Sequence, residues 1–145
     1  MRLPQTATGD SLAKRAGIML LSLSVRIAEE FHSKEEASMP LGDLARLAKR
    51  CGYGALCMRA SQVGVQSPPE IVEAAADCLA EAGLAVSMVT GDFDTVYNNE
   101  KGPSALTNIT PYLDLAKRLG APRIRVALKE ESDTAYARRA VDVAA

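Results

Sequence analysis

The stretch LAKRCGYGALCM at residues 47–58 decides the fold, because a single glycine separates the end of an expected helix from an apolar strand. The arrangement recurs as LAEAGLAVSMV at residues 79–89 and as LAKRLGAPRIRVAL at residues 115–128. Glycine readily takes the left-handed conformation that ends a helix, and basic residues are favoured in the last helical turn. The spacing of the three copies indicates a repeating βα unit of about 34 residues.

Repeating βα units predict parallel strands that alternate with helices. The expected strands lie at residues 18–28, 54–60, 85–90 and 123–128. The expected helices lie at residues 40–51, 68–82, 110–120 and from 133 or 134 onward. In the second helix, Ser67 and Glu70 fit a capping box. The expected buried face of that helix consists of Ile71, Ala75, Cys78 and Leu79.

We therefore predict an α/β fold of parallel βα units, about the first four of the eight units of a TIM barrel. In this interpretation residues 1–17 form an N-terminal extension and residues 18–145 form the half-barrel. The segment 91–108 is expected to be a long loop, a kind of connection that often carries function. An open doubly wound sheet is the alternative fold, although no glycine-rich phosphate loop follows the first strand.

The composition limits the partners that we expect. The 145 residues include 17 basic and 18 acidic ones, and this net charge of −1 gives no overall attraction to nucleic acid or membranes. The three cysteines fit neither a metal-ligand spacing nor a disulfide framework, which is typical of a reduced, cytoplasmic protein. No apolar run in the sequence is long enough to cross a membrane.

Four basic residues break the apolar pattern of the expected strands on one face only. They are Arg26, Arg59, Arg125 and Lys129. If the aliphatic face packs on the helices, these cations point into the barrel, where a buried charge needs a partner. The partner is either a carboxylate of the other barrel half or an anionic substrate. We expect substrate contact for Arg59 and Lys129, near the carboxyl ends of their strands, and barrel-lining ion pairs for Arg26 and Arg125.

Other candidates for substrate binding follow the strands directly, where barrel enzymes place their chemistry. Glu29 follows the first expected strand, and Asp92 and Asn98 lie in the loop after the third. The alternative for each is an ordinary solvated loop residue. His32 is the single histidine, and no metal-ligand, nucleophile or phosphate-loop pattern occurs. We therefore expect no metal ligand and no catalytic residue in this chain.

Three segments in succession resemble the sugar phosphate isomerase/epimerase family, which has the xylose-isomerase-like TIM barrel. The segments read AKRCGYGALCMRA (48–60), EAGLAVSMVTGDF (81–93) and LDLAKRLGAPRIRV (113–126). The family's motif positions are occupied by Gly52, Tyr53, Arg59, Gly83, Leu84, Leu119, Gly120, Ala121, Arg125 and Val126. The resemblance extends over about residues 18 to 145.

The resemblance implies an enzyme that moves protons next to a carbonyl in a sugar or sugar phosphate. In the family a divalent metal (Mn, Mg, Zn or Co) is held by two glutamates, an aspartate and a histidine from later strands, which this chain lacks. We therefore expect the N-terminal part of such an isomerase or epimerase, inactive alone, with its metal bound only in the full-length protein.

Two other functions stay open. The first is a non-catalytic or self-pairing half-barrel module, for which a homo-oligomer would be expected. The second is a DNA-repair endonuclease of the same superfold, but the balanced charge lacks the basic duplex-binding face that this activity requires.

Overall fold

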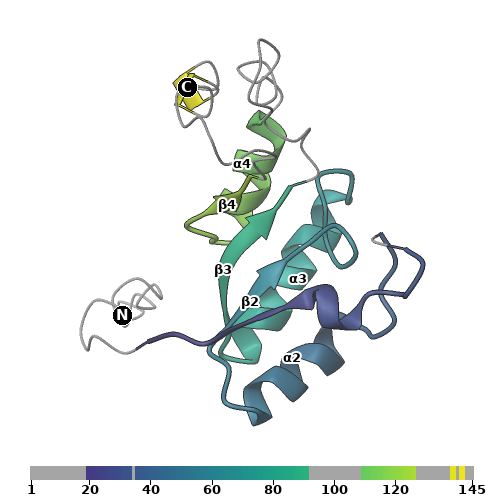
Figure 1. The fold of residues 1–145 in the computed structure, drawn as a ribbon. Helices are drawn as coiled ribbons and strands as arrows, with labels where there is room; N and C mark the ends of the chain where they lie inside the picture. Colours follow the sequence, from purple (N-terminus) through teal and green to yellow (C-terminus); the bar gives the residue numbers. More distant parts are fainter. Residues whose placement is uncertain (1–18, 34, 92–108, 127–137, 140, 143–145) are drawn as a thin grey trace, which may run out of the picture.

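The computed structural model describes residues 19–33, 35–91, 109–126, 138, 139, 141 and 142 (Figure 1). The expected N-terminal extension, most of the long loop after the third strand and most of the last expected helix lie outside these residues. The last four described residues are helical.

The described strands form one parallel sheet in the order β1-β2-β3-β4. The strands are β1 (Ser22–Ser24), β2 (Ala55–Met58), β3 (Ala85–Thr90) and β4 (Ile124–Arg125). They alternate with the helices α2 (Leu41–Arg50), α3 (Pro69–Glu81) and α4 (Thr110–Arg118). The parallel α/β class is thus confirmed. In a doubly wound sheet the strand order reverses beside the first strand, so the first strand lies inside the sheet. In the described sheet β1 lies at an edge, which differs from that alternative.

The three glycines end their helices as the sequence predicts. Gly52, Gly83 and Gly120 have φ angles of 86°, 65° and 67°, in the left-handed region. After each glycine, the next amide donates back to the helix: Tyr53 to Ala48, Leu84 to Leu79, and Ala121 to Ala116. These are the bonds of Schellman motifs, which satisfy the last carbonyls of the helix and turn the chain toward the next strand.

The hydrophobic core lies on one face of the sheet, under the helices. On this face the strands contribute Leu56, Met58, Val86 and Val89. The helices contribute Leu44, Ala45 and Ala48 from α2, Val72, Ala75 and Leu79 from α3, and Leu115 and Ala116 from α4. Sequential parallel strands with right-handed crossovers place all connecting helices on the same face, which accounts for this single core.

The opposite face is not covered by α2, α3 or α4; we call it the helix-free face, and it is concave. The Ser22 and Ser87 hydroxyl oxygens lie 2.6 Å apart, although β2 separates their strands. In a flat sheet two strands at this separation lie about 10 Å apart, too far for two serine side chains to meet. A register shift between Leu56 and Cys57 marks an irregularity opposite Ser87, and irregularities of this kind bend a strand. The sheet therefore curves toward its helix-free face.

The first strand is shorter than expected. It ends at Ser24, and the chain continues as the 3₁₀ helix η1 (Val25–Ala28). The Ser24 hydroxyl accepts a hydrogen bond from the Arg26 amide, which favours the turn over a continued strand. The prediction of a strand through residue 28 is therefore wrong after Ser24, although the apolar alternation continues.

The predicted capping box of the second helix is also wrong. α3 begins at Pro69 after Pro68, and no side chain caps it. The Ser67 hydroxyl instead accepts a hydrogen bond from the Gly64 amide, inside the loop that precedes the helix. The buried face of α3 contains Val72 in addition to Ala75 and Leu79, whereas Ile71 is exposed.

Two glycines, Gly42 inside α2 and Gly52 just past its end, should respond oppositely to replacement by alanine. Gly52→Ala should destabilise the protein by about 1–2 kcal/mol, because its left-handed φ is strained for any residue with a Cβ. Gly42→Ala lies inside the helix, where a Cβ would meet only Arg46 and Cys78 atoms at 3.6 and 3.7 Å. It should stabilise the protein by about 0.4–1 kcal/mol. Urea unfolding measures both, and equal effects would contradict the helix-stop role of Gly52.

Candidate functional site

The candidate site centres on a buried ion pair at the carboxyl ends of β1 and β2. The Arg59 Nε donates to the Glu29 Oε1 at 2.5 Å. The Glu29 side chain is only 7% exposed and the Arg59 side chain 14%. Burial at this level is costly for each charge alone, so each one depends on the other.

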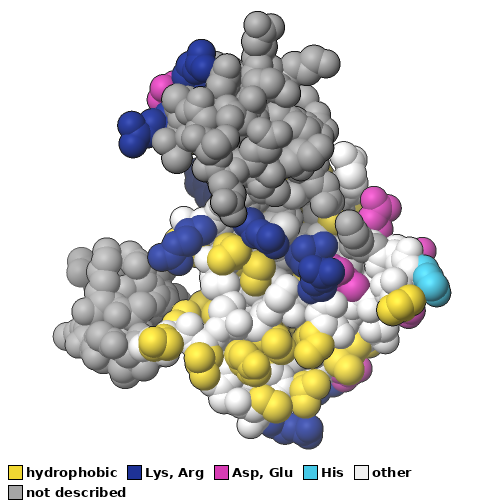
Figure 2. Space-filling view, viewed as in Figure 1, with side chains coloured by type: hydrophobic (Ala, Val, Ile, Leu, Met, Phe, Trp, Pro, Cys, Tyr) yellow, Lys and Arg dark blue, Asp and Glu magenta, His cyan; other side chains and the backbone are white. Residues whose placement is uncertain are grey.

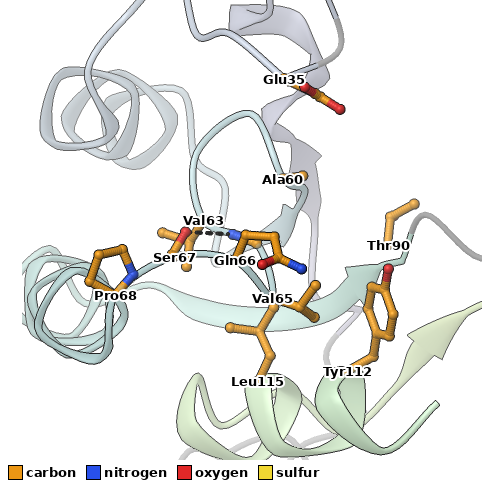
Figure 3. A pocket seen from close by; sticks show the side chains of 11 residues that line it. Glu35, Ala60, Val63, Val65, Gln66, Ser67, Pro68, Thr90, Tyr112 and Leu115 are labelled. Carbon is orange, nitrogen blue, oxygen red and sulfur yellow. Dashed lines mark hydrogen bonds between the residues drawn. The ribbon is translucent and has the colours of Figure 1, made fainter. Parts of the chain in front are cut away.

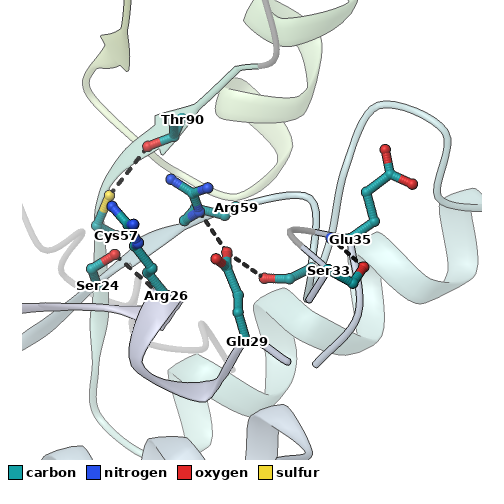
Figure 4. Close-up of polar contacts among 9 residues, drawn as sticks. Ser24, Arg26, Glu29, Ser33, Glu35, Cys57, Arg59 and Thr90 are labelled. Carbon is teal, nitrogen blue, oxygen red and sulfur yellow. Dashed lines mark hydrogen bonds and ion pairs between the residues drawn. The ribbon is translucent and has the colours of Figure 1, made fainter. Parts of the chain in front are cut away.

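A serine completes this cluster, which we call the rim cluster (Glu29, Arg59 and Ser61). The Ser61 hydroxyl donates to the same Glu29 oxygen at 3.0 Å, and the serine itself is buried. Figure 4 shows the terminal nitrogens of Arg59 directed away from Glu29, toward the end of β3 at Thr90. Glu29 therefore orients the guanidinium through Nε, and the other edge of the guanidinium faces the helix-free side of the sheet.

The loop after β2 holds Arg59 and Ser61 in place by short-range bonds. The amides of Gln62 and Val63 both donate to the Arg59 carbonyl at 3.1 Å. The Gln62 side-chain amide donates to the Met39 carbonyl at 2.9 Å, which ties this loop to the segment before α2. A Cβ at Gly64 would lie 3.1 Å from the Ala60 Cβ, which is a tight contact, so the loop closes closely on itself at this glycine.

The polar side chains of the helix-free face lie beside the cluster. The register of the ladder places Cys57 and Arg59 of the β2 segment on the same face as Thr90 and Arg125. The Cys57 sulfur and the Thr90 hydroxyl lie 3.6 Å apart. Arg125 pairs in register with Thr90, so a second cation stands at the level of the rim cluster, on the other side of β3.

A cavity of about 520 Å³ opens at the same end of the sheet (Figure 3). Its polar side chains come from Glu35, Gln66, Ser67, Thr90 and Tyr112. Its apolar lining includes Val63, Val65 and Leu115. The cavity lies between the loop after β2, the end of β3 and α4, and its lining continues from Ala60, the residue next to Arg59. This volume is large enough for a small metabolite.

The structure brings together two of the predicted site residues and separates others. Glu29 and Arg59, predicted from different segments, contact each other directly. The partner of Arg59 is therefore a carboxylate of this chain. Arg125 shares the helix-free face, whereas Arg26 lies exposed on η1 rather than on the strand that its barrel-lining prediction assumed. Asp92, Asn98 and Lys129 lie outside the described residues.

Sequence reasoning missed Ser61, Gln62 and the cavity. Ser61 follows Arg59 by two residues, and this spacing alone could have suggested a shared contact. His32 is exposed and packs edge-on against the exposed Phe31, with ring centroids 4.8 Å apart.

The residues present do not fit the metal site that the family resemblance implies. Within the described part of the chain, no three His, Cys, Asp or Glu side chains lie close enough together to hold a metal ion. The rim cluster holds one carboxylate, which Arg59 and Ser61 already occupy.

Comparison with protein-family models and with curated proteins gives no match for this chain. Among the described residues, no helix combines the length and apolar character needed to cross a membrane.

Loss of one charge of the buried pair should be far more costly than loss of an exposed one. Glu29→Gln leaves Arg59 buried without its partner and should destabilise the protein by about 3–5 kcal/mol. The matched control is Glu73→Gln, because Glu73 pairs with Arg118 at 3.2 Å but is 72% exposed. This change should cost no more than about 1 kcal/mol.

A double-mutant cycle separates the pair from its surroundings. The double variant Glu29→Gln/Arg59→Met should be destabilised by clearly less than the sum of the two single variants. Each single variant leaves one buried charge unpaired, whereas the double variant leaves none. Urea unfolding of the four proteins measures the coupling. Additive costs would show that the two side chains do not stabilise each other.

Proposed function

We propose that this chain is the substrate-binding part of a sugar or sugar phosphate isomerase or epimerase built on a TIM barrel. The observation that carries the proposal is the buried Glu29–Arg59 pair at the carboxyl ends of parallel strands, beside a cavity of about 520 Å³. Barrel enzymes bind their substrates at this end of the strands. The concave helix-free face and the sequence resemblance support the same proposal.

In this proposal Arg59 binds the anionic group of the substrate. Glu29 occupies Nε, so the terminal nitrogens of the guanidinium offer two parallel donors that match phosphate or carboxylate oxygens. Arg125 adds a second positive charge on the same face, which offsets the neutralisation of Arg59 by Glu29.

The cavity receives the hydroxyl-bearing part of the substrate. Gln66, Ser67 and Thr90 offer groups that donate and accept hydrogen bonds, as sugar hydroxyls do. Val65 and Leu115 offer apolar contact for the C–H groups of a sugar. These residues contribute by fixing the position of the substrate, which lowers the entropic cost of a later reaction.

The proton-transfer step belongs to the strands that complete the barrel in this proposal. The described residues contain no cluster of three His, Cys, Asp or Glu side chains that could hold a metal ion. Their role in the proposal is to bind and orient the substrate. We therefore expect the 145-residue chain alone to exchange no substrate proton with solvent.

Titration of the ¹⁵N-labelled chain with ribulose 5-phosphate tests the binding role. The amide shifts should concentrate at Ser61, Gln66 and Thr90, because these residues line the rim cluster and the cavity. Arg59→Lys should weaken binding by about tenfold or more, since it removes the paired donors while keeping the charge.

Arg46→Lys is the matched control. Arg46 is an exposed arginine of α2 that also pairs with a carboxylate, Asp43, and its replacement should leave the affinity unchanged. Ribulose, which lacks the phosphate group, should bind more weakly than ribulose 5-phosphate. An absence of shifts at the rim, or equal effects of the two lysine variants, would overturn the proposal.

A further inference from the structure

The described sheet has two free edges, and they are the edges that a closed barrel would join. β1 pairs only with β2, and β4 pairs only with β3, among the described strands. A parallel sheet is normally covered on both faces, whereas the helices described here cover one.

The curvature of this sheet has the direction that closure requires. The Ser22–Ser87 contact across β2 shows that the sheet is concave on its helix-free side. Eight strands form the smallest common barrel whose interior side chains fill completely. The four described strands already curve in this direction, and they amount to half of an eight-stranded barrel.

Exposed apolar residues flank β1 in the sequence. Met19, Leu20 and Leu21 directly precede β1, and their side chains are 83%, 51% and 54% exposed. Ile27 and Phe31 follow at 71% and 93%. Figure 2 shows hydrophobic side chains in several patches on the face where β1 lies in front. An exposed edge strand flanked by apolar residues is prone to pair with another strand, so pairing with a further strand is favoured at this edge.

We infer that the 145-residue chain pairs with a second copy of itself and closes an eight-stranded parallel barrel. A twofold axis along the barrel places β4 of one copy beside β1 of its partner, in parallel, at two identical seams. This geometry is isologous and leaves no free edge, unlike an open chain of copies. The net charge of −1 on each copy does not oppose the pairing.

The concave faces suit this arrangement. Along the strands their described side chains are small, at Ser22, Ser24, Cys57, Ser87 and Thr90, and the cations Arg59 and Arg125 lie at the carboxyl ends, so two such faces can meet without collision. The charged pair of each rim cluster is already neutralised within its own copy. Both rim clusters then open at one mouth, which contains residues of both copies.

This inference does not rest on the proposed function. In a longer protein the same surface would take the strands that complete the barrel, and in the isolated chain the second copy occupies their place. Binding of ribulose 5-phosphate and the mass of the particle are separate measurements, so either proposal can fail alone.

Light scattering coupled to size-exclusion chromatography tests the pairing. The 145-residue chain should have about twice the mass of 15.4 kDa. Leu21→Lys should convert the dimer to monomer by placing a charge at the seam. Leu113→Lys is the control, because Leu113 is 48% exposed on α4, outside the β1 edge, and its change should leave the dimer intact.

Three results would overturn the inference. A wild-type monomer would show that the edges stay unpaired. Species that grow without limit as concentration rises would show open-ended pairing instead of closure. Equal dissociation by the two lysine variants would show that the interface does not lie at β1. Circular dichroism of each variant verifies that it is folded.

Discussion

The left-handed glycine at the end of each helix is the constraint on which this fold depends. Each glycine reverses the chain within two residues, so that the next strand starts directly under the helix that precedes it. Three such turns at similar spacing give strands in sequential order and helices on one face. The other face is left for side chains that do not belong in a hydrophobic core, and the charged and polar residues of the strands collect there.

The rim cluster uses that free face. Arg59 stands one position past the last core residue of β2, Met58, so its side chain takes the opposite face. The chain after β1 turns into η1 and brings Glu29 to it within hydrogen-bond distance. A buried pair of this kind does not by itself stabilise a protein more than apolar residues would. In the proposed function, its value lies in fixing the direction of the Arg59 guanidinium near the cavity, whose lining includes the neighbouring Ala60.

The sequence predicted the features that depend on local chemistry. The helix stops at Gly52, Gly83 and Gly120 are confirmed, and the parallel class follows from them. Arg59 was expected to leave the helix-covered face and to need a partner. That the partner is Glu29 could not be predicted, because the contact depends on the turn of η1, which interrupts an apolar alternation that looks like a continuous strand.

The incorrect predictions have the same origin. Ser67 has the spacing of a capping residue, but its hydroxyl is occupied by the Gly64 amide of a loop that closes on Ala60. Such competition between two local bonds is decided by the packing of the whole loop. The cavity is likewise formed by three segments far apart in sequence, the loop after β2, the end of β3 and α4. No spacing within one segment could indicate it.

A crystal structure of the chain with ribulose 5-phosphate tests the central claim most directly. The account predicts phosphate oxygens on the terminal nitrogens of Arg59, with Glu29 still on Nε, and the sugar hydroxyls in the cavity near Gln66 and Thr90. A ligand bound elsewhere, or a phosphate that displaces Arg59 from Glu29 and leaves the cavity empty, would contradict it.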